Sequence, residues 1–226
     1  MPSADSVFEE VPNSKRGVAL AGSRQLGVNQ QILEVAKHLF ARYGYEGTSL
    51  AAIAHGAGIT LEELSDHFSD KLGILTAIFE EGWAGINERL QDIVINSLNA
   101  REATLSMMAV MMRILDRDGD LARLLLFESR RPHPGTGEIM LSQGYRWFAR
   151  LCVELAVRGQ KDGSFRASFN PRAIASMVSG ALEGLMRDRC LAEEQGHTMP
   201  LNGAELMTAF DALVTYLGPE RYHAKS

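Results

Sequence analysis

The stretch from Thr48 to Phe68, TSLAAIAHGAGITLEELSDHF, constrains the fold of this chain more than any other part of it. Its apolar residues recur at helical spacing on both sides of Ala57-Gly58-Ile59, a sequence typical of a tight bend. Thr60 is a good N-cap residue and Glu63 follows three positions later, which is the pattern of a capping box. The stretch therefore predicts two short helices that cross at a turn, the arrangement of a helix-turn-helix unit.

The rest of the chain also carries helical periodicity, and no segment alternates with the period of two that marks a strand. Ser69 and Asp70 predict the start of a long helix that continues to about residue 99, a rod of roughly 40 Å at 1.5 Å per residue. Further helices are expected over about residues 29–43, 102–116, 119–130, 136–159, 171–195 and 203–217. The predicted fold class is all-α, with an N-terminal three-helix head that contains the helix-turn-helix and a C-terminal helical bundle.

Four regions are expected along the chain. Residues 1–28 mix Pro, Ser, Gly and scattered charges without periodicity, and are predicted to form a disordered N-terminal arm. Residues 29–75 form the helix-turn-helix domain, with Asn29 as the predicted cap of its first helix and Gly44 as its stop. Residues 76–218 form the helical body, and 219–226 a tail.

Composition describes an ordinary globular protein, with 46% hydrophobic and 23% charged residues. No apolar run approaches the roughly 18 residues of a membrane span, and no leader pattern opens the chain, so a cytoplasmic protein without a membrane partner is expected. Cys152 and Cys190 lie in apolar helical patterns and are predicted to be reduced core residues. No phosphate-binding loop, His-Glu-x-x-His or Gly-x-Ser-x-Gly sequence is found. The chain is therefore not expected to be an enzyme, and no catalytic residue, metal or cofactor is predicted.

Residues 29–79 resemble the DNA-binding head of the TetR family of one-component bacterial transcription regulators. The resemblance rests on residues at helical spacing and on the turn between the short helices: Ile32, Leu33, Ala36, Leu39, Phe40, Gly44, Tyr45, Thr48, Ser49, Ile53, Ala54, Ala57, Gly58, Ile59, Thr60, Leu64, His67, Phe68, Lys71 and Leu75. The body matches the family's ligand and dimerisation domain in outline, through the break at Asp162-Gly163 and the helix opened by Asn170-Pro171. The resemblance implies a homodimer that binds a palindromic operator in double-stranded DNA. It further implies a repressor that is released when a small-molecule effector enters the body.

The resemblance also implies which residues of the head contact DNA. Thr48 and Lys71 would contact phosphates. The second short helix would enter the major groove and present Thr60, Leu61, Ser65, Asp66 and His67 to it.

The head departs from the family pattern in its second short helix and in its charge. Ser65 stands where the family usually has a tyrosine that touches a phosphate, and residues 29–75 hold three Lys and Arg against six Asp and Glu. Phosphate neutralisation supplies most non-specific affinity for DNA, which this head is poorly equipped to provide. Two interpretations stay open: Glu62 or Asp66 accepts a hydrogen bond from a cytosine amino group, or the chain is a TetR-like ligand-binding or protein-interaction dimer with weak or lost DNA binding.

Apolar side chains that crowd three helices of the body predict an effector pocket for an apolar or amphipathic molecule, such as an acyl chain or an aromatic compound. The predicted lining is Met108, Met111, Met112, Phe127, Tyr145, Phe148 and Cys152. Glu128, Arg130 and Arg131 are candidates for its mouth, with a solvated helix end as the alternative. For each apolar side chain, the alternative is an ordinary place in the core.

Small residues at three- and four-residue spacing in residues 173–187 allow helices to approach closely. Together with the apolar face of the last helix they predict a two-fold, isologous dimer interface. The predicted interface residues are Ser176, Gly180, Gly184, Phe210, Leu213 and Leu217. The alternative is that these residues pack within one chain.

Overall fold

The structure of the protein, a computed structural model, describes residues 14–128, 130, 141–194, 196 and 203–219. Within these residues the chain forms nine helices and no strand, so the all-α prediction is confirmed. The helices are α1 (Ser14–Tyr43), α2 (Leu50–Gly56), α3 (Leu61–His67), α4 (Lys71–Asn96), α5 (Ala100–Arg117), α6 (Gly119–Glu128), α7 (Gln143–Asp162), α8 (Pro171–Glu194) and α9 (Gly203–Tyr216).

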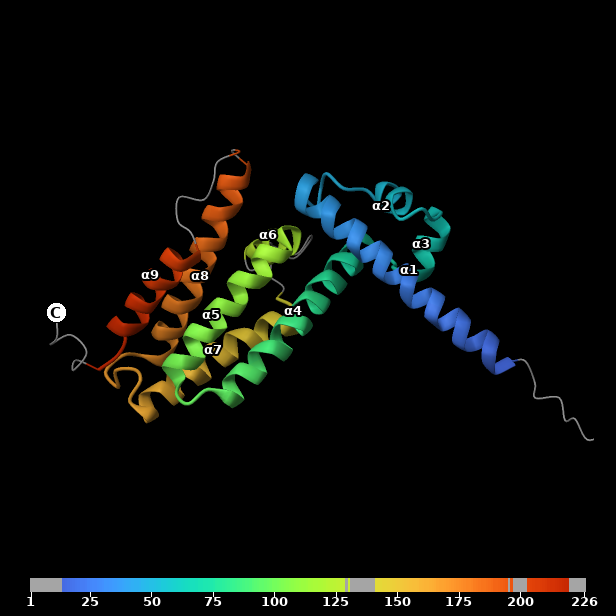
Figure 1. Cartoon of the computed structure of the whole chain (residues 1–226). Helices are drawn as coiled ribbons and strands as arrows, with labels where there is room; N and C mark the ends of the chain where they lie inside the picture. Colours follow the sequence, from blue (N-terminus) through green and yellow to red (C-terminus); the bar gives the residue numbers. More distant parts are fainter. Residues whose placement is uncertain (1–13, 129, 131–140, 195, 197–202, 220–226) are drawn as a thin grey trace, which may run out of the picture.

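The molecule has a small head and a larger body joined by one continuous helix. α1, α2 and α3 form the head at one end of α4, α5 and α7 lie along α4, α8 and α9 lie beyond them, and α6 lies next to the head (Figure 1). The head has its own buried apolar residues from four helices: Ile32, Phe40, Ile53, Leu64 and Ile74. Because α4 contributes to the cores of both parts, a change in its position relative to the body moves the head.

α1 is longer than the pattern predicted. It begins at Ser14, so residues 14–28, expected as an irregular arm, are helical, and Asn29 lies inside the helix instead of capping it. No proline interrupts residues 14–43, and the glycines at 17, 22 and 27 weaken a helix without breaking it. The predicted stop is confirmed, because Gly44 follows the helix with a φ of +75°.

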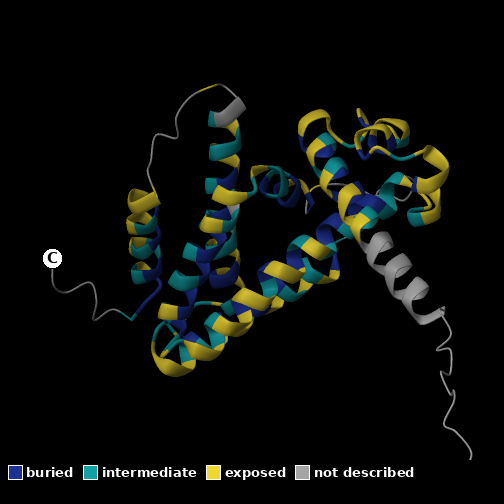
Figure 2. Cartoon of the chain, turned by 45° about the vertical axis from the view of Figure 1, so that its right-hand side comes forward, coloured by how far each residue is buried: buried dark blue, intermediate teal, exposed yellow. Residues whose placement is uncertain are grey.

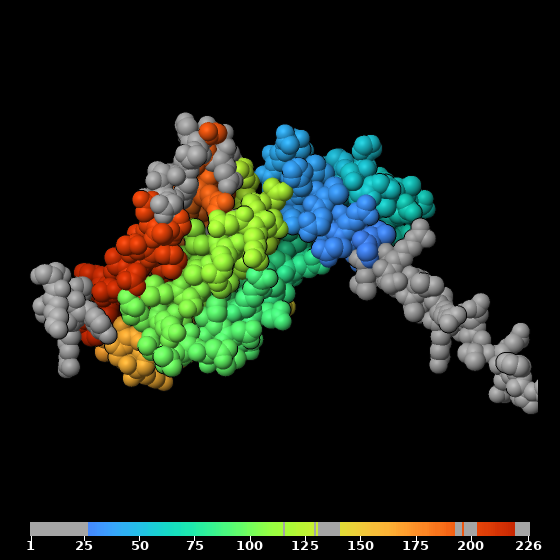
Figure 3. Space-filling view, viewed as in Figure 1, coloured from blue at the N-terminus to red at the C-terminus, as the bar shows by residue number. Residues whose placement is uncertain are grey.

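The body is built around α4, α5 and α7, which pack against one another, while α8 covers α7 and α9 covers α5. α6 packs against α8 on one side and against α1 of the head on the other, where the two parts of the molecule meet (Figure 3). Apart from the starts of α1 and α7, the helix ends agree with the predicted ones to within a few residues. The predicted start of α7 at residue 136 lies outside the described residues, as does the tail beyond Pro219.

The α4–α5 turn is fixed to α7 by side chains of α7. Arg158 donates hydrogen bonds to the carbonyls of Val94 and Ser97 at 2.8 Å, and the Asp162 carboxylate accepts the Ala100 N–H at 2.8 Å. α7 then ends at Gly163, whose φ of +82° a side chain rarely adopts. The far end of α4 is therefore held against the body. Among the described residues, no helix is long and apolar enough to cross a membrane.

Candidate nucleic-acid interface and effector cavity

The α2–α3 turn forms as the sequence predicted. Ala57 is buried between the helices, and Gly58 takes a φ of +66°, which needs a glycine. The Thr60 hydroxyl accepts the Glu63 N–H at 3.1 Å while the Glu63 carboxylate accepts the Thr60 N–H at 2.8 Å. This is the predicted capping box, and it satisfies two backbone donors at the start of α3.

α3 turns one face into the head and the rest toward solvent. Leu64 is fully buried, whereas Leu61 is 52% exposed and Glu62, Ser65 and Asp66 are exposed. Figure 2 shows α2 and α3 on the outer side of the head, away from the body. The predicted groove-facing side chains are thus on the surface, with His67 half-buried and Thr60 exposed but engaged in the cap.

Thr48 has a structural environment that does not suit the phosphate contact expected for it. Its side chain is buried, and the hydroxyl lies 2.9 Å from the Gly44 carbonyl and 3.2 Å from that of Leu39. A hydroxyl enclosed in this way closes the α1–α2 loop and does not reach a DNA backbone. Ser49, the next residue, is the one that caps α2, by accepting the Ala52 N–H.

Lys71 is also engaged inside the head. Its ammonium donates to the carbonyls of Tyr45 and Thr48, at 2.6 Å and 2.8 Å, and lies 4.3 Å from the centre of the Tyr45 ring. These contacts tie the start of α4 to the α1–α2 loop. One of the three N–H donors of Lys71 remains for a phosphate, so its main contribution in this structure is to the shape of the head.

The other positive charges of residues 29–75 are few. Lys37 forms ion pairs with Glu34 at 2.8 Å and with Asp118 of the body at 2.7 Å. Burial alone lowers the pKa of Lys37, but its hydrogen bonds to Asp118 and Glu34 outweigh that and raise the pKa above its ordinary value. Arg42 is exposed and lies over the Tyr43 ring. The described part of the head therefore offers little positive charge to a DNA backbone.

The body contains an apolar cavity among α5, α7 and α8. It is lined by Thr104, Met107, Met108, Met111, Phe148, Cys152, Leu155, Ala156, Phe165, Ile174, Ala175, Val178, Ser179, Leu182 and Phe210. The free space between these side chains is only about 30 Å³, on the scale of a water molecule. A larger ligand must displace side chains to enter, and the three flexible methionines are well suited to that.

Four of the seven residues predicted for the pocket line this cavity, namely Met108, Met111, Phe148 and Cys152. Tyr145 lines a neighbouring groove, and Met112 is half-buried outside the cavity. Phe127 is 53% exposed and does not line it. Five of the eleven lining residues that were not predicted come from α8, where Ile174, Val178 and Leu182 repeat every four positions beside the small residues. That spacing was the signal available for them.

Cys152 faces the cavity from α7 and is buried, as the sequence predicted. Burial raises the pKa of its thiol to about 12, because a thiolate is poorly solvated among apolar side chains. Cys152 therefore belongs to the apolar wall as a neutral thiol. No group of His, Cys, Asp and Glu residues in the described segments is arranged to hold a metal ion.

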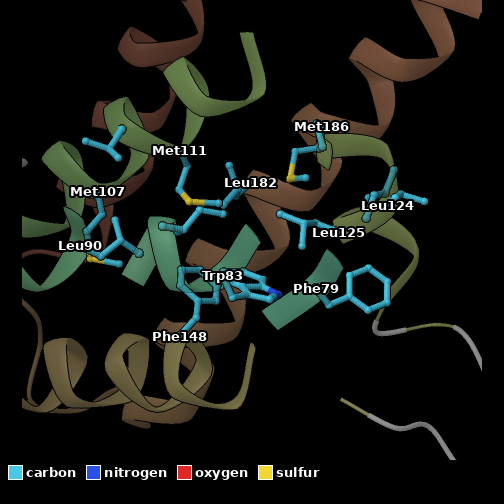
Figure 4. Packing of buried hydrophobic residues seen from close by; sticks show 14 of the residues in the cluster. Phe79, Trp83, Leu90, Met107, Met111, Leu124, Leu125, Phe148, Leu182 and Met186 are labelled. Atoms are coloured by element: carbon cyan, nitrogen blue, oxygen red, sulfur yellow. The ribbon is translucent and has the colours of Figure 1, made fainter. Parts of the chain in front are cut away.

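Two of the three candidates for a pocket mouth, Glu128 and Arg130, lie elsewhere, and Arg131 is outside the described residues. Glu128 is 1% exposed; its carboxylate accepts the indole N–H of Trp83 at 2.7 Å and the Ser142 N–H at 2.8 Å. Arg130 pairs with Glu183 at 3.0 Å. Glu128 thus joins α4, the end of α6 and the start of α7, and it does so through Trp83, whose ring lies beside that of Phe148 in Figure 4.

The residues predicted for a dimer interface separate into two groups. Ser176 and Gly180 are exposed on α8 and Gly184 is half-buried, so this face is available to a second chain. Phe210 and Leu217 are 3% and 0% exposed and lie in the core of their own chain, and Leu213 is half-buried. For Phe210 and Leu217 the intramolecular alternative is correct, because the apolar face of α9 packs onto α5.

These features define a class of protein: a helix-turn-helix head carried on a continuous helix above a helical body with an apolar cavity, as in one-component DNA-binding regulators. Residues 32–78 match the family described as "Bacterial regulatory proteins, tetR family". The head of this chain belongs to that family.

Similar proteins cover the head and most of the body. HTH-type transcriptional repressor KstR2 of Rhodococcus jostii (strain RHA1) is 24% identical over 148 residues, which span 66% of this chain and 72% of that protein. The structure of FadR from Bacillus subtilis in complex with stearoyl-CoA superimposes with a TM-score of 0.70 and 17% identity, covering 84% of this chain and 97% of that one. The structure of AibR in complex with isovaleryl coenzyme A and operator DNA superimposes with a TM-score of 0.66 and 20% identity, covering 85% of this chain and 98% of that one. At these identities the two structures establish a common fold.

Proposed function

We propose that this protein is a homodimeric transcriptional repressor that binds a palindromic operator and is released by an amphipathic effector with an acyl chain. The observation that carries the proposal is the exposed outer face of α3, on a head whose buried residues match the family. Residues 29–75 read DNA in this proposal, and residues 76–218 bind the effector and the second chain. Leu61, Ser65, Asp66 and His67 face the bases, and Asp66 accepts a hydrogen bond from a cytosine amino group.

The class of effector follows from the apolar cavity. Its lining is apolar apart from two hydroxyls and a neutral thiol, and it lies among the helices that hold α4. An acyl chain suits such a wall, and FadR and AibR, which share the fold, are bound to stearoyl-CoA and isovaleryl coenzyme A in their solved structures. An acyl thioester of coenzyme A is therefore the effector that we propose.

The effector and the operator oppose each other through α4. A chain that enters the cavity pushes on Phe148, and Phe148 stacks on Trp83 of α4. Movement of α4 changes the separation of the two heads, which must stay at about 34–36 Å to reach successive major grooves. By linkage, an effector that weakens operator binding is itself bound more weakly by the operator complex.

Selection of duplexes from a random pool, with the purified full-length protein at low salt, tests the operator. A regulator enriches a palindrome with a fixed half-site spacing, and its affinity for that palindrome falls as salt rises. Addition of an acyl-CoA then lowers the affinity for the enriched duplex. If candidate effectors bind the protein but leave operator affinity unchanged, the proposed mechanism is wrong.

The excess of acidic residues on the head favours a second candidate, a ligand-binding or protein-interaction dimer with weak or lost DNA binding. Lys37 and Lys71 are both engaged within the chain, and α3 exposes Glu62 and Asp66. The same selection separates the two candidates, because this second protein enriches no sequence at any salt concentration.

A further inference from the structure

A second, larger hollow lies beside the apolar cavity, between α7 and α8. This groove is lined by Tyr145, Phe148, Ala149, Arg150, Cys152, Val153, Glu154, Arg172, Ala175, Ser176 and Ser179, and it encloses about 520 Å³. Ligand sites in proteins have volumes of roughly 300–1,000 Å³, so the groove has the size of a ligand site while the cavity does not.

The groove and the cavity share a wall. Phe148, Cys152, Ala175 and Ser179 line both of them. The two spaces differ in chemistry, because the cavity is apolar while the groove adds two arginines, a glutamate, a tyrosine and a serine. A molecule that spans the shared wall therefore has an apolar tail and a polar head group.

Arg150 and Arg172 give the groove its charge. Both are exposed, one on α7 and one at the start of α8, and neither guanidinium has a hydrogen-bond or ion-pair partner among the residues that the structure describes. By contrast, Arg101, Arg130 and Arg158 each hold a carboxylate or carbonyl of the fold. Glu154 is the one acidic residue of the groove lining, so two positive charges face one negative charge. An arginine pair of this kind suits phosphate oxygens, which guanidinium groups bind in bidentate fashion.

We infer that this groove is the site of the phosphorylated head group of the effector, which Arg150 and Arg172 bind while the acyl chain passes between Phe148 and Ala175 into the cavity. The inference rests on the proposed function and names the residues that select the head group. Coenzyme A carries a diphosphate and a 3′-phosphate, whereas a free fatty acid has one carboxylate next to its chain. The groove is too large for that carboxylate alone, which favours the coenzyme A thioester over the fatty acid.

Isothermal titration of the full-length protein without DNA tests this directly. The probes share a ten-carbon chain and differ in head group: decanoyl-CoA, decanoate and the neutral thioester S-decanoyl-N-acetylcysteamine. Arg150→Ala and Arg172→Ala each lower the affinity for decanoyl-CoA by about tenfold, the scale of one lost charge-assisted hydrogen bond. Neither change affects the affinity for the neutral thioester, because the cavity is untouched.

Arg113→Ala is the matched control. It removes the same charge from an exposed position on α5 that lines neither space. We expect it to leave the binding of all three probes unchanged, which separates a local contact from the overall charge of the protein. Raising the salt concentration should weaken decanoyl-CoA binding in the original protein and in the Arg113→Ala variant more than in the arginine variants.

The outcomes distinguish this inference from the proposed function. The head-group assignment is overturned if the two arginine variants lose equal affinity for decanoyl-CoA and for the neutral thioester, or lose none for either. It is also overturned if the original protein binds decanoate more tightly than decanoyl-CoA. A shift of the Arg172→Ala variant to monomer on gel filtration also overturns it, because the groove then belongs to the interface with a second chain, to which Ser176 was assigned. If neither thioester binds the original protein, the effector class proposed above is itself wrong, and the head-group assignment, which rests on it, is wrong as well.

Discussion

The rings of Trp83 and Phe148 stack with their centroids 5.1 Å apart and their planes inclined by 29°. Phe148 lines both the apolar cavity and the groove, while Trp83 lies in α4 and donates its indole N–H to the buried Glu128 carboxylate. Gly144 allows this approach of α7 to α4, because a Cβ at that position would lie 2.1 Å from the Trp83 Cβ. One ring pair thus connects the space that a ligand enters with the helix that carries the head.

We expect Trp83→Phe to weaken the communication between effector and operator. The change keeps an aromatic ring but leaves one oxygen of Glu128 without a donor, which lowers the free energy of unfolding by about 1–3 kcal/mol. The coupling free energy, typically about 1–3 kcal/mol, should decrease, while the affinity of the free protein for effector changes little. Fluorescence anisotropy of a labelled operator, titrated with effector, measures the coupling.

The control for this experiment is Trp147→Phe, since Trp147 precedes Phe148 but has neither the ring contact nor the bond to Glu128. An unchanged coupling in Trp83→Phe, or an equal loss in both variants, would exclude the route through this ring pair.

Residues of α3 should separate into those that hold the head together and those that read DNA. Leu64→Ala opens a cavity in the head and lowers the free energy of unfolding by about 2–5 kcal/mol. Asp66→Ala changes an exposed side chain and should alter stability by no more than about 0.5 kcal/mol, while it changes the base preferred at one operator position. Urea denaturation and repeated duplex selection measure the two effects. An unaltered preference in Asp66→Ala would remove this residue from the interface.

Lys71→Met tests whether this lysine is structural or a phosphate ligand. The variant keeps the apolar stem but loses the two bonds to the Tyr45 and Thr48 carbonyls. Hydrogen bonds of charged groups are worth about 1.5–3 kcal/mol each, so a clear fall in the melting temperature is expected. The salt dependence of DNA affinity should keep its slope. If the slope of the logarithm of affinity against the logarithm of salt concentration decreases by about 0.9 while stability is unchanged, Lys71 is a phosphate ligand.

The sequence was sufficient to predict where most helices lie, but it was insufficient to predict what each face of a helix contacts. Amphipathic periods and caps such as Thr60 with Glu63 depend on neighbours a few residues away, so they can be predicted from the chain alone. Phe127 and Phe210 were misplaced for a different reason: the apolar stripe of a helix shows that one face is buried, but not which helix buries it. Lys71 and Glu128 acquire partners 14 to 45 residues away, which no local pattern contains.

Stability should fall at acidic pH in a way that depends on Asp162. Burial alone raises the pKa of this carboxyl, but the hydrogen bonds from Ser164 and Ala100 and the charge of Arg158 outweigh it and hold the pKa below its ordinary value. Because the folded pKa lies below the unfolded one, the contribution to stability is present above about pH 4 and is lost as the pH falls through the folded pKa. Asp162→Asn should flatten the dependence of unfolding free energy on pH between about pH 5 and 3. An acid slope identical to that of the original protein would show that Asp162 has no part in it.

The thiol of Cys152 offers a direct measure of whether the cavity opens. With its pKa raised to about 12 and its side chain among apolar neighbours, the thiol at pH 8 is almost entirely protonated and enclosed. In a Cys190→Ser variant, a disulfide reagent should therefore label Cys152 slowly, at a rate set by how often α7 and α8 separate. An acyl-CoA that fills the cavity should slow the labelling further, in proportion to occupancy, because the chain lies against the sulfur. Coenzyme A without an acyl chain reaches only the groove, from which it covers one side of Cys152, and should protect less. Rapid labelling in the absence of ligand would mean that the thiol is open to solvent from the cavity or from the groove, and equal protection by both compounds would mean that the acyl chain does not enter the cavity.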